Sequence, residues 1–246
     1  MKRFENKTIL ITGASSGIGL AGAKRLIEEG AHVIFTGRTE SHVQAAAAEL
    51  GDHATAVLDD VSDGNTLERI IPVVERAGAL DGVWLNAAYA AGGPLEEMDQ
   101  ATLDQIFKVN VVAPMIQMGA LSPYVKDGGS VLVTSSTAAY EGAPIVSAYA
   151  ATKAAILAAA RGWASELAPR NIRVNSLVPG PITSNLRSVL PDEMRAQFEE
   201  RFAEAVLLKR VGDAHEAAAV ALFLLSDEAS YVTGSSYTVD GGLIMQ

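Results

Sequence analysis

A tyrosine and a lysine four positions apart, Tyr149 and Lys153, are the residues of this sequence best suited to acid–base chemistry. They fall at the start of a segment with strong helical periodicity, so both side chains should project from one face of a helix. A phenol can give a proton to an alkoxide on a substrate if its pKa, normally about 10, is brought closer to neutrality. A cation such as Lys153 would lower the pKa in that direction. A Tyr-x3-Lys pair alone is common in helices, so the pattern needs support.

Two polar residues supply that support. Ser136 lies 13 residues before Tyr149 and follows a buried strand expected at residues 130–134. The carboxyl ends of parallel strands line ligand sites. Asn110 lies inside a long helix expected at residues 102–125, where asparagine is unfavourable unless its amide has a task. The candidate catalytic residues are therefore Asn110, Ser136, Tyr149 and Lys153.

A glycine-rich turn at residues 12–19 follows the first expected strand and opens the first expected helix. Gly13 lets the chain leave the strand sharply, Gly17 lets the backbone approach a pyrophosphate, and Gly19 lets helix and sheet pack closely. The helix N-terminus then offers unpaired N–H groups to the phosphates. No Lys-Ser/Thr pair follows Gly17, so the turn favours a dinucleotide over a nucleoside triphosphate. The candidate phosphate-binding residues are Gly13, Ser15, Ser16, Gly17, Ile18 and Gly19.

The end of the second expected strand, residues 32–36, bears on the choice between nicotinamide cofactors. NAD sites usually place Asp or Glu there to accept a hydrogen bond from the ribose 2′-hydroxyl. Here the chain continues with Gly37-Arg38, so no carboxylate repels a 2′-phosphate and a guanidinium can bind one. We predict NADP(H) rather than NAD(H), with an exposed loop cation as the alternative interpretation of Arg38. Asp60, after the third expected strand, either accepts from the adenine amino group or caps the next helix.

Apolar runs of four to six residues alternate with stretches of helical periodicity along the chain. Strands that are apolar on both faces belong to parallel sheets covered by helices. We predict one α/β domain over residues 1–246, a doubly wound parallel sheet of the Rossmann type with about seven strands and helices on both faces, and a substrate lid at about 184–210. Strands are expected at 8–12, 32–36, 54–58, 82–86, 130–134, 173–178 and 236–239, and helices at 17–29, 41–50, 65–77, 102–125, 149–168 and 213–225.

Composition argues against several classes of partner and site. The 246 residues carry a formal net charge of -10, so nucleic acid and an anionic membrane surface are poor partners. There are no cysteines, which excludes disulfides, thiolate metal sites and a cysteine nucleophile. The sequence shows neither a signal peptide nor a run of about 18 apolar residues, so a cytoplasmic location is expected. The four histidines lack metal-ligand spacing, so no catalytic metal is expected.

Together and in this order, the motifs resemble those of the short-chain dehydrogenase/reductase family over almost the whole chain. The resemblance implies an oxidoreductase that moves a hydride between nicotinamide and a carbonyl or secondary alcohol. It also implies a homotetramer built through the helices near 102–125 and 149–168. The matching pieces are Thr12-Gly-x3-Gly-Ile-Gly19, Asp60-Val61, Asn86-Ala87, Asn110, Ser136, Tyr149-x3-Lys153, Asn175, Pro179-Gly180-x-Ile182-Thr183 and Val239-Asp240-Gly241-Gly242.

The resemblance implies a role for each site residue. Tyr149 would be the general acid/base, and Lys153 would hold the nicotinamide ribose and lower the Tyr149 pKa. Ser136 would hydrogen-bond the substrate oxygen, and Asn110 would anchor a water that relays protons from Lys153 to solvent. Besides the phosphate-binding turn and Arg38, the cofactor would contact Asp60, Val61, Asn86, Ala87, Ala88, Tyr149, Lys153, Pro179, Gly180, Ile182 and Thr183, with Ala88 standing where the family usually has glycine.

The substrate is less constrained than the cofactor. Residues 88–94, 137–146 and 184–210 should line its site, and the apolar side chains of the last segment fit either a pocket or the core of a small lid. A ketone reductase, an alcohol dehydrogenase and a 3-oxoacyl-thioester reductase all remain open. The alternative from another class is a catalytically silent dinucleotide-binding redox sensor. Some relatives bind a structural cation through a C-terminal glutamine, and this chain ends in Gln246.

Overall fold

One parallel sheet of seven strands forms the centre of the molecule, which confirms the predicted doubly wound fold. The computed structural model describes residues 2–183 and 200–245. The strand order is β3-β2-β1-β4-β5-β6-β7, so the chain starts in the middle, winds to one edge and returns to fill the other side. The strands are β1 (Thr8–Ile11), β2 (His32–Gly37), β3 (Ala54–Leu58), β4 (Leu80–Leu85), β5 (Val125–Thr134), β6 (Arg173–Pro179) and β7 (Ser236–Val239).

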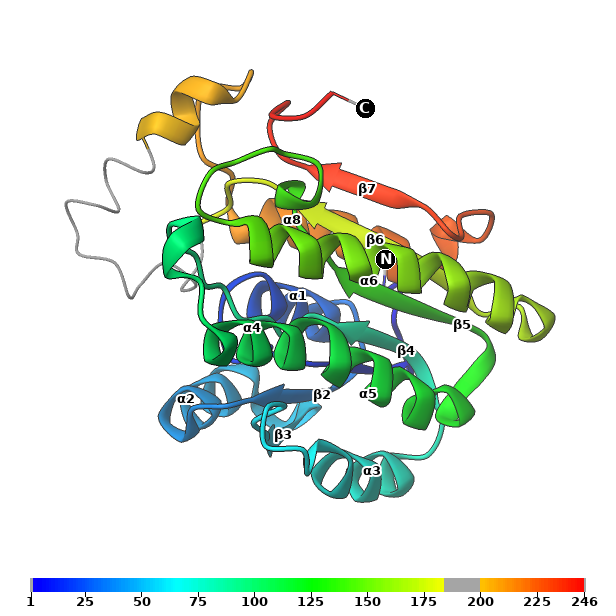
Figure 1. The fold of residues 1–246 in the computed structure, drawn as a ribbon. Helices are drawn as coiled ribbons and strands as arrows, with labels where there is room; N and C mark the ends of the chain where they lie inside the picture. The colour runs from blue at the N-terminus through cyan, green and yellow to red at the C-terminus, as the bar shows by residue number, and fades with distance from the viewer. Residues whose placement is uncertain (1, 184–199, 246) are drawn as a thin grey trace.

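Helices cover both faces of the sheet, with α4, α5 and α6 in front of it and α1 and α8 behind it in the view of Figure 1. Two apolar cores result, one beneath α1, α2 and α8 and the other beneath α3, α5 and α6. The α-helices are α1 (Gly17–Glu28), α2 (Glu40–Leu50), α3 (Thr66–Ala77), α4 (Gln100–Phe107), α5 (Ala113–Leu121), α6 (Ser147–Leu167) and α8 (Ala214–Leu225). Short 3-10 helices span Gly51–His53, Leu95–Glu97, Ser122–Tyr124, Thr137–Ala139, Ala168–Arg170 and Asp227–Ala229.

The segment expected as one helix at 102–125 is divided, so that prediction is wrong. α4 and α5 are separated by a π-helical turn, Lys108–Val112, that contains Asn110. Pro114 stands in the first turn of α5, where its missing N–H costs no hydrogen bond. π turns change the face on which the following side chains lie and are frequent at functional sites. The interruption thus falls at a candidate catalytic residue.

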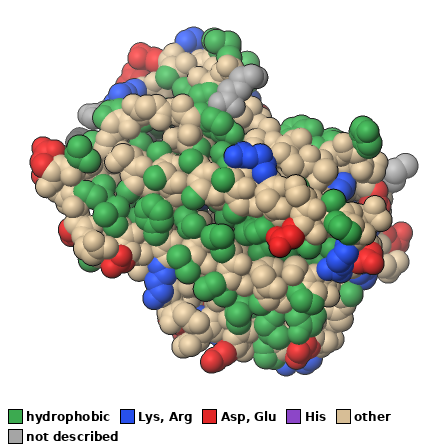
Figure 2. Space-filling model, turned by 45° about the vertical axis from the view of Figure 1, so that its right-hand side comes forward, with side chains coloured by type: hydrophobic (Ala, Val, Ile, Leu, Met, Phe, Trp, Pro, Cys, Tyr) green, Lys and Arg blue, Asp and Glu red, His purple; other side chains and the backbone are tan. Residues whose placement is uncertain are grey.

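Exposed apolar side chains extend from the end of α4 through the π turn into α5, whereas the rest of the exposed side of α4 is polar. Phe107, Val112, Met115 and Ile116 are 37%, 46%, 49% and 50% exposed. Figure 2, which looks obliquely onto the side that carries α5 and α6, shows hydrophobic side chains gathered in patches with few charged ones between them. Contiguous exposed apolar surface of this kind usually marks an interaction site.

Most of the segment expected as a lid, 184–210, lies outside the described residues. Its described end is helical at 200–205. The chain before and after the segment pairs through two backbone hydrogen bonds, from Thr183 N to Gly212 O and from Gly212 N to Pro181 O, both 2.9 Å long. The two ends of the segment therefore lie side by side, next to the carboxyl end of β6.

Candidate active site

The glycine-rich turn between β1 and α1 has the backbone that the sequence predicts. Gly13 and Gly17 have φ angles of +67° and +57°, which L side chains rarely adopt. A Cβ on Gly13 would lie 2.7 Å from the Ala87 Cα, and one on Gly19 would lie 2.7 Å from the Asn86 Nδ2. Side chains at Gly13 and Gly19 are therefore excluded by close contacts, whatever the backbone angles.

The N-terminus of α1 is left open. Ser16 is the N-cap residue, yet its side chain makes no capping hydrogen bond. α2, α3 and α6 also begin without a side-chain cap, whereas α4 and α8 have one, so the glycine turn in front of α1 is what distinguishes its N-terminus. The first N–H groups of a helix lack partners within the helix, and its dipole places positive charge there. The open helix end after a glycine turn fits the pyrophosphate of a dinucleotide.

Asn86 holds this turn from the side of the sheet. Its Nδ2 donates to the carbonyl oxygens of Thr12 (3.2 Å) and Gly13 (3.1 Å). Its Oδ1 accepts from the Thr134 hydroxyl at 3.0 Å. The Thr12 hydroxyl in turn accepts from the N–H groups of Asn86 (3.0 Å) and Ala87 (3.1 Å). The amide of Asn86 is thus committed to shaping the turn.

Arg38 follows β2 at the same edge of the sheet. A Cβ on the preceding Gly37 would lie 2.6 Å from the Ser15 Oγ, so Arg38 begins beside the phosphate-binding turn. The Arg38 side chain is exposed and makes no hydrogen bond or ion pair with any other described residue. Its donors are therefore available to a ligand.

Asp60 follows β3 at this edge and is half-buried. Its Oδ1 accepts from the N–H (2.9 Å) and the hydroxyl (2.7 Å) of Ser62. The N-cap residue of α3 is Asn65, so the alternative that Asp60 caps this helix is wrong. The turn fixes the Asp60 carboxylate at the edge where the dinucleotide is expected.

Burial controls the acidity of Tyr149. The pKa of its phenol is raised above the usual 10 because burial disfavours the phenolate, and a hydrogen bond with Ser136 acts in the opposite direction. The Nζ of Lys153 lies 5.6 Å from the centroid of the Tyr149 ring. The expectation of a lowered Tyr149 pKa is therefore not met by the groups of the protein alone, since desolvation outweighs the other contributions.

Lys153 is buried at the carboxyl end of β5, with 2% of its surface exposed. Burial lowers its pKa from 10.5 to about 8. Its Nζ donates to the carbonyl oxygen of Thr134 at 3.0 Å, and the Ser135 hydroxyl donates to the Lys153 carbonyl oxygen at 2.8 Å. Thr134 thus holds the side chain of Lys153, and the neighbouring Ser135 holds its main chain.

The amide of Asn110 has the task that its position in a helix predicts. Its Nδ2 donates to the Tyr89 carbonyl oxygen (2.8 Å) and the Thr152 hydroxyl (3.0 Å), and its Oδ1 accepts from the Tyr89 N–H (2.8 Å). These bonds connect the loop after β4 to Thr152 of α6, the residue before Lys153. Both amide N–H groups are occupied, so any water held by Asn110 would have to be bound by an oxygen atom.

The remaining predicted residues lie at the same edge. Pro179 ends β6 beside Val239 of β7. A Cβ on Gly180 would lie 2.6 Å from the Asp240 Cβ, so this turn packs tightly on the C-terminal segment. Along the sheet, the carboxyl ends of the strands bring together the 12–19 turn, Arg38, Asp60-Val61, Asn86-Ala87-Ala88, Ser136 and Pro179–Thr183.

Several positioning residues are not predicted from the sequence. The Thr12 hydroxyl holds the glycine turn by accepting from the Ala87 N–H. The Thr134 carbonyl oxygen accepts from the Lys153 Nζ, and the Thr152 hydroxyl accepts from the Asn110 Nδ2. Thr12 belongs to the matching glycine motif, whereas Thr134 and Thr152 have no signal beyond adjacency to predicted residues, since threonine in a strand or helix is ordinary.

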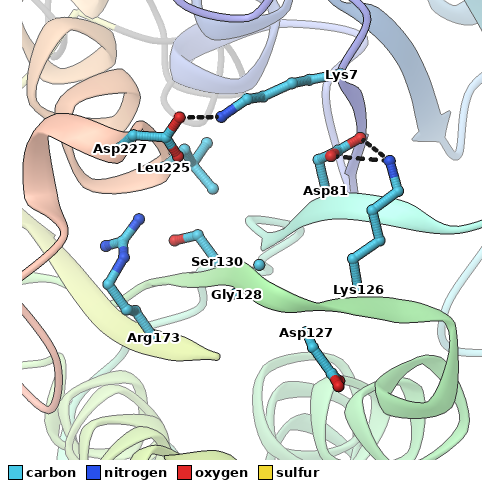
Figure 3. A pocket seen from close by; sticks show the side chains of 10 residues that line it. Lys7, Asp81, Lys126, Asp127, Gly128, Ser130, Arg173, Leu225 and Asp227 are labelled. Carbon is cyan, nitrogen blue, oxygen red and sulfur yellow. Dashed lines mark hydrogen bonds and ion pairs between the residues drawn. The ribbon is translucent and has the colours of Figure 1, made fainter. Parts of the chain in front are cut away.

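A small polar cavity of about 160 Å³ lies at the opposite, amino-terminal edge of the sheet. Lys7 pairs there with Asp227 (2.7 Å) and Lys126 with Asp81 (2.9 Å), as Figure 3 shows. Arg173 donates to carbonyl oxygens at the end of α8. Because it lies at the opposite edge of the sheet, this cavity is separate from the candidate active site.

Two kinds of feature are not found in the described part of the chain. No group of three or more His, Asp or Glu there has an arrangement that could hold a metal ion. No described helix is both long and apolar enough to cross a bilayer. Gln246, the candidate interface ligand, lies outside the described residues.

Comparison with known proteins identifies the family. The family model described as enoyl-(acyl carrier protein) reductase matches residues 13–244. Oxidoreductase asL5 of Sarocladium schorii is 37% identical over 99% of this chain and 98% of its own length. Dehydrogenase/reductase SDR family member 4 of Homo sapiens is 36% identical over 96% of this chain and 87% of its own length.

The chain belongs to the short-chain dehydrogenase/reductase family. A solved structure from Brucella melitensis, described as a short-chain dehydrogenase/reductase SDR:glucose/ribitol dehydrogenase, superposes with a TM-score of 0.92 at 32% identity over 99% of both chains. Members of the family are oxidoreductases that use a nicotinamide dinucleotide and act on small molecules carrying a secondary alcohol or ketone. The open end of α1 and the glycine turn fit that cofactor.

Proposed function

We propose that this protein is an NADP(H)-dependent reductase or dehydrogenase that interconverts a ketone and a secondary alcohol. The observation that carries the proposal is the grouping of Ser136, Tyr149 and buried Lys153 at the strand edge that also bears the dinucleotide turn. A silent redox sensor would not be expected to keep all three groups in place.

Each of the three side chains has a distinct part in the proposed reaction. The Ser136 hydroxyl donates a hydrogen bond to the substrate oxygen, and the Tyr149 phenol gives its proton to the same oxygen as negative charge develops there. When bound, the nicotinamide supplies or accepts the hydride, and its oxidised ring carries a positive charge. That charge, with the Lys153 ammonium, would counter the effect of burial on the Tyr149 pKa. Lys153, with a pKa of about 8, is suited to passing a proton on near neutral pH.

The preference for NADP(H) rests on Arg38. Its exposed guanidinium lies beside the phosphate turn and is not paired with any described residue. A 2′-phosphate would accept charge-assisted hydrogen bonds from it, whereas a ribose 2′-hydroxyl would leave it without an anion.

The substrate class is proposed more broadly as a small carbonyl compound or secondary alcohol. The matching family model is described as an enoyl-(acyl carrier protein) reductase, and a solved structure 34% identical to this chain is described as a putative betaketoacyl-ACP reductase, which supports including 3-oxoacyl thioesters among the candidates. We further propose that residues 184–210 cover the substrate, because Thr183 and Gly212, on either side of this segment, pair next to the carboxyl end of β6.

The first experiment is cofactor titration followed by turnover of a substrate panel. NADPH and NADH binding is followed by nicotinamide fluorescence, and oxidation of NADPH is measured with ketones, 3-oxoacyl thioesters, sugars and quinones. Tyr149→Phe should bind NADPH as the wild type does, while kcat falls by about 10²–10⁴-fold because the proton donor is lost. Tyr231→Phe is the matched control, since Tyr231 is a fully exposed surface tyrosine.

Three results would count against the proposal. Tyr149→Phe with wild-type turnover would refute the assigned acid. Tight NADPH binding without turnover of any panel member would favour the redox-sensor alternative. Failure of the wild type to bind either nucleotide would remove the basis for both.

We propose that four copies of this chain assemble into a homotetramer. The apolar surface of α4 and α5 formed by Phe107, Val112, Met115 and Ile116 supports burial against another copy. Sedimentation velocity should give the mass of four chains for the wild type and smaller species for Ile116→Glu, because a charge would then be buried in the interface. A wild-type monomer would refute the assembly.

We also propose a cytoplasmic location, supported by the cysteine-free composition and the absence of a spanning helix among the described residues. Fractionation of cells that express the protein would test it, and recovery in the membrane pellet would contradict it.

A further inference from the structure

A chain of side-chain hydrogen bonds runs from the core of the sheet to the cofactor turn. The indole Nε1 of Trp84 in β4 donates to the Thr134 hydroxyl in β5 at 2.8 Å. That hydroxyl donates to the Asn86 Oδ1 at 3.0 Å. The Asn86 Nδ2 then donates to the carbonyl oxygens of Thr12 and Gly13. Three side chains thus connect a fully buried indole to the residues that open the phosphate-binding turn.

The indole fixes the direction of every bond in this chain. Tryptophan can only donate, so the Thr134 hydroxyl must accept from it and direct its own single proton elsewhere. That proton goes to the Asn86 Oδ1, which leaves the two N–H groups of the amide facing the turn. An amide rotated the other way would place its oxygen against two carbonyl oxygens. Trp84 therefore determines that Asn86 attracts the turn instead of repelling it.

Trp84 is itself fixed by packing. Its surface is completely buried. A Cβ on Gly22 of α1 would lie 2.3 Å from the Trp84 Cζ3, so the helix leaves room for the indole only because it has glycine at that position. Core packing holds the indole ring, so the chain of bonds begins at a rigid point.

The same threonine also holds the catalytic candidate on the other side of the site. The Thr134 carbonyl oxygen accepts from the Lys153 Nζ at 3.0 Å. The Thr134 backbone and hydroxyl therefore face two different parts of the reaction centre, the lysine and the cofactor turn. Any displacement of Thr134 would alter the position of both.

We propose that Trp84, Thr134 and Asn86 form a positioning brace that sets the cofactor turn and Lys153 relative to each other. None of the three is assigned a contact with substrate; they act through the turn and the lysine. The inference rests on the proposed function for its cofactor and activity readouts, while its hydrogen bonds can be tested without either.

Thr134→Val tests the brace because it removes the hydroxyl and keeps the shape of the side chain. It leaves the Trp84 N–H and the Asn86 Oδ1 without their shared partner, so the NADPH Kd should rise about tenfold. At saturating NADPH, kcat should also fall by about tenfold as Lys153 shifts. Thr134→Ser restores the hydroxyl and should return both values to within about twofold of the wild type.

Ser130→Ala is the matched control. Ser130 also lies in β5 and is buried, but it lies four residues before Thr134, and its hydroxyl donates to the Leu224 carbonyl oxygen of α8 at 3.0 Å instead of to the site. Ser130→Ala should have a lower free energy of unfolding than the wild type and leave the NADPH Kd and kcat unchanged. If Thr134→Val does not fold, Trp84→Phe removes the indole N–H together with part of the buried ring, and should weaken NADPH binding in the same direction.

Indole resonances give a readout that does not depend on the cofactor. The chain has two tryptophans, and Trp163→Phe assigns the Trp84 Nε1–H signal in a ¹H–¹⁵N spectrum. That signal should move upfield in Thr134→Val and return in Thr134→Ser. An unchanged signal, wild-type Kd in Thr134→Val, no recovery in Thr134→Ser, or the same weakening in Ser130→Ala would overturn the brace. Wild-type protein that binds no nicotinamide nucleotide, yet shows the expected indole shifts, would refute the proposed function and leave the hydrogen-bond chain intact.

Discussion

Replacing Lys153 by methionine should make the cofactor-free protein more stable near neutral pH while impairing the proposed reaction. Lys153 is 2% exposed, and burial lowers its pKa from 10.5 to about 8. One pKa unit corresponds to about 1.4 kcal/mol, so keeping this lysine charged in the folded protein costs about 3 kcal/mol. Methionine has a similar length and no charge. It leaves the Thr134 carbonyl oxygen without its donor, which offsets part of the gain by about 1–3 kcal/mol.

The offset from the Thr134 carbonyl oxygen does not change with pH. The pH dependence of the free energy of unfolding therefore isolates the effect of burial on Lys153. Between about pH 8 and 10.5 the unfolded chain keeps the Lys153 proton and the folded chain releases it, so wild-type stability from this group rises with pH. At pH 7 the lysine is charged in both states and contributes no such gain. The wild type should therefore gain about 2 kcal/mol relative to Lys153→Met between pH 7 and pH 9.5. The upper limit avoids titration of Tyr149, whose pKa is raised above 10.

Urea denaturation of both proteins at equal concentration measures this difference. Lys2→Met, which removes an exposed lysine, serves as the control and should follow the wild type at every pH. Stability curves for the wild type and Lys153→Met that run parallel from pH 7 to 9.5 would refute the conclusion that burial depresses the Lys153 pKa.

Two other substitutions test separate features of the structure. Arg38→Asp should lower the NADPH to NADH ratio of kcat/KM by about 10–100-fold, since one charge-assisted contact is lost and a repulsion is gained; an unchanged ratio would place the 2′-phosphate elsewhere. Ile145 is a β-branched residue with φ of +61° and a half-exposed side chain, so Ile145→Asn should raise the free energy of unfolding by about 1 kcal/mol in urea titrations. Equal or lower stability of Ile145→Asn would mean that the isoleucine gains more from its contacts than the backbone conformation costs.

Most of the fold could be predicted from the sequence because its signals are local. Each buried strand is a short apolar run, and the alternation with helices fixes parallel pairing. The failure at 102–125 has a physical cause. Apolar residues suited to a helix continue on both sides of the π turn, since α4 is amphipathic and α5 is apolar on its buried and exposed faces, so the hydrophobic pattern does not mark the inserted residue. Two residues indicated a break in the helix: Asn110, which disfavours a helix interior, and Pro114, which lacks the N–H that a continuous helix needs.

The site residues were predictable where their type is unusual for its position. A glycine cluster after a strand and a tyrosine–lysine pair after a serine stand out against ordinary helix and strand composition. The Trp84–Thr134 bond gave no such signal, because an indole N–H and a threonine hydroxyl in neighbouring strands meet only through the register of β4 and β5. The register depends on the packing of the whole sheet, which a single sequence does not display.

Three departures from the rules of stable folding lie together at the carboxyl edge of the sheet. α1 begins without a side-chain cap directly after the glycine turn, so its first N–H groups face the expected phosphate position. Lys153 is buried without a carboxylate partner among the described residues, and Asn110 interrupts a helix. Each feature lowers the free energy of unfolding. A side-chain cap, a neutral side chain or a continuous helix at the same place would raise it. Their concentration at one edge is the physical reason to place the reaction there, because each of the three becomes favourable only when an anion, a developing negative charge or a relayed proton is present.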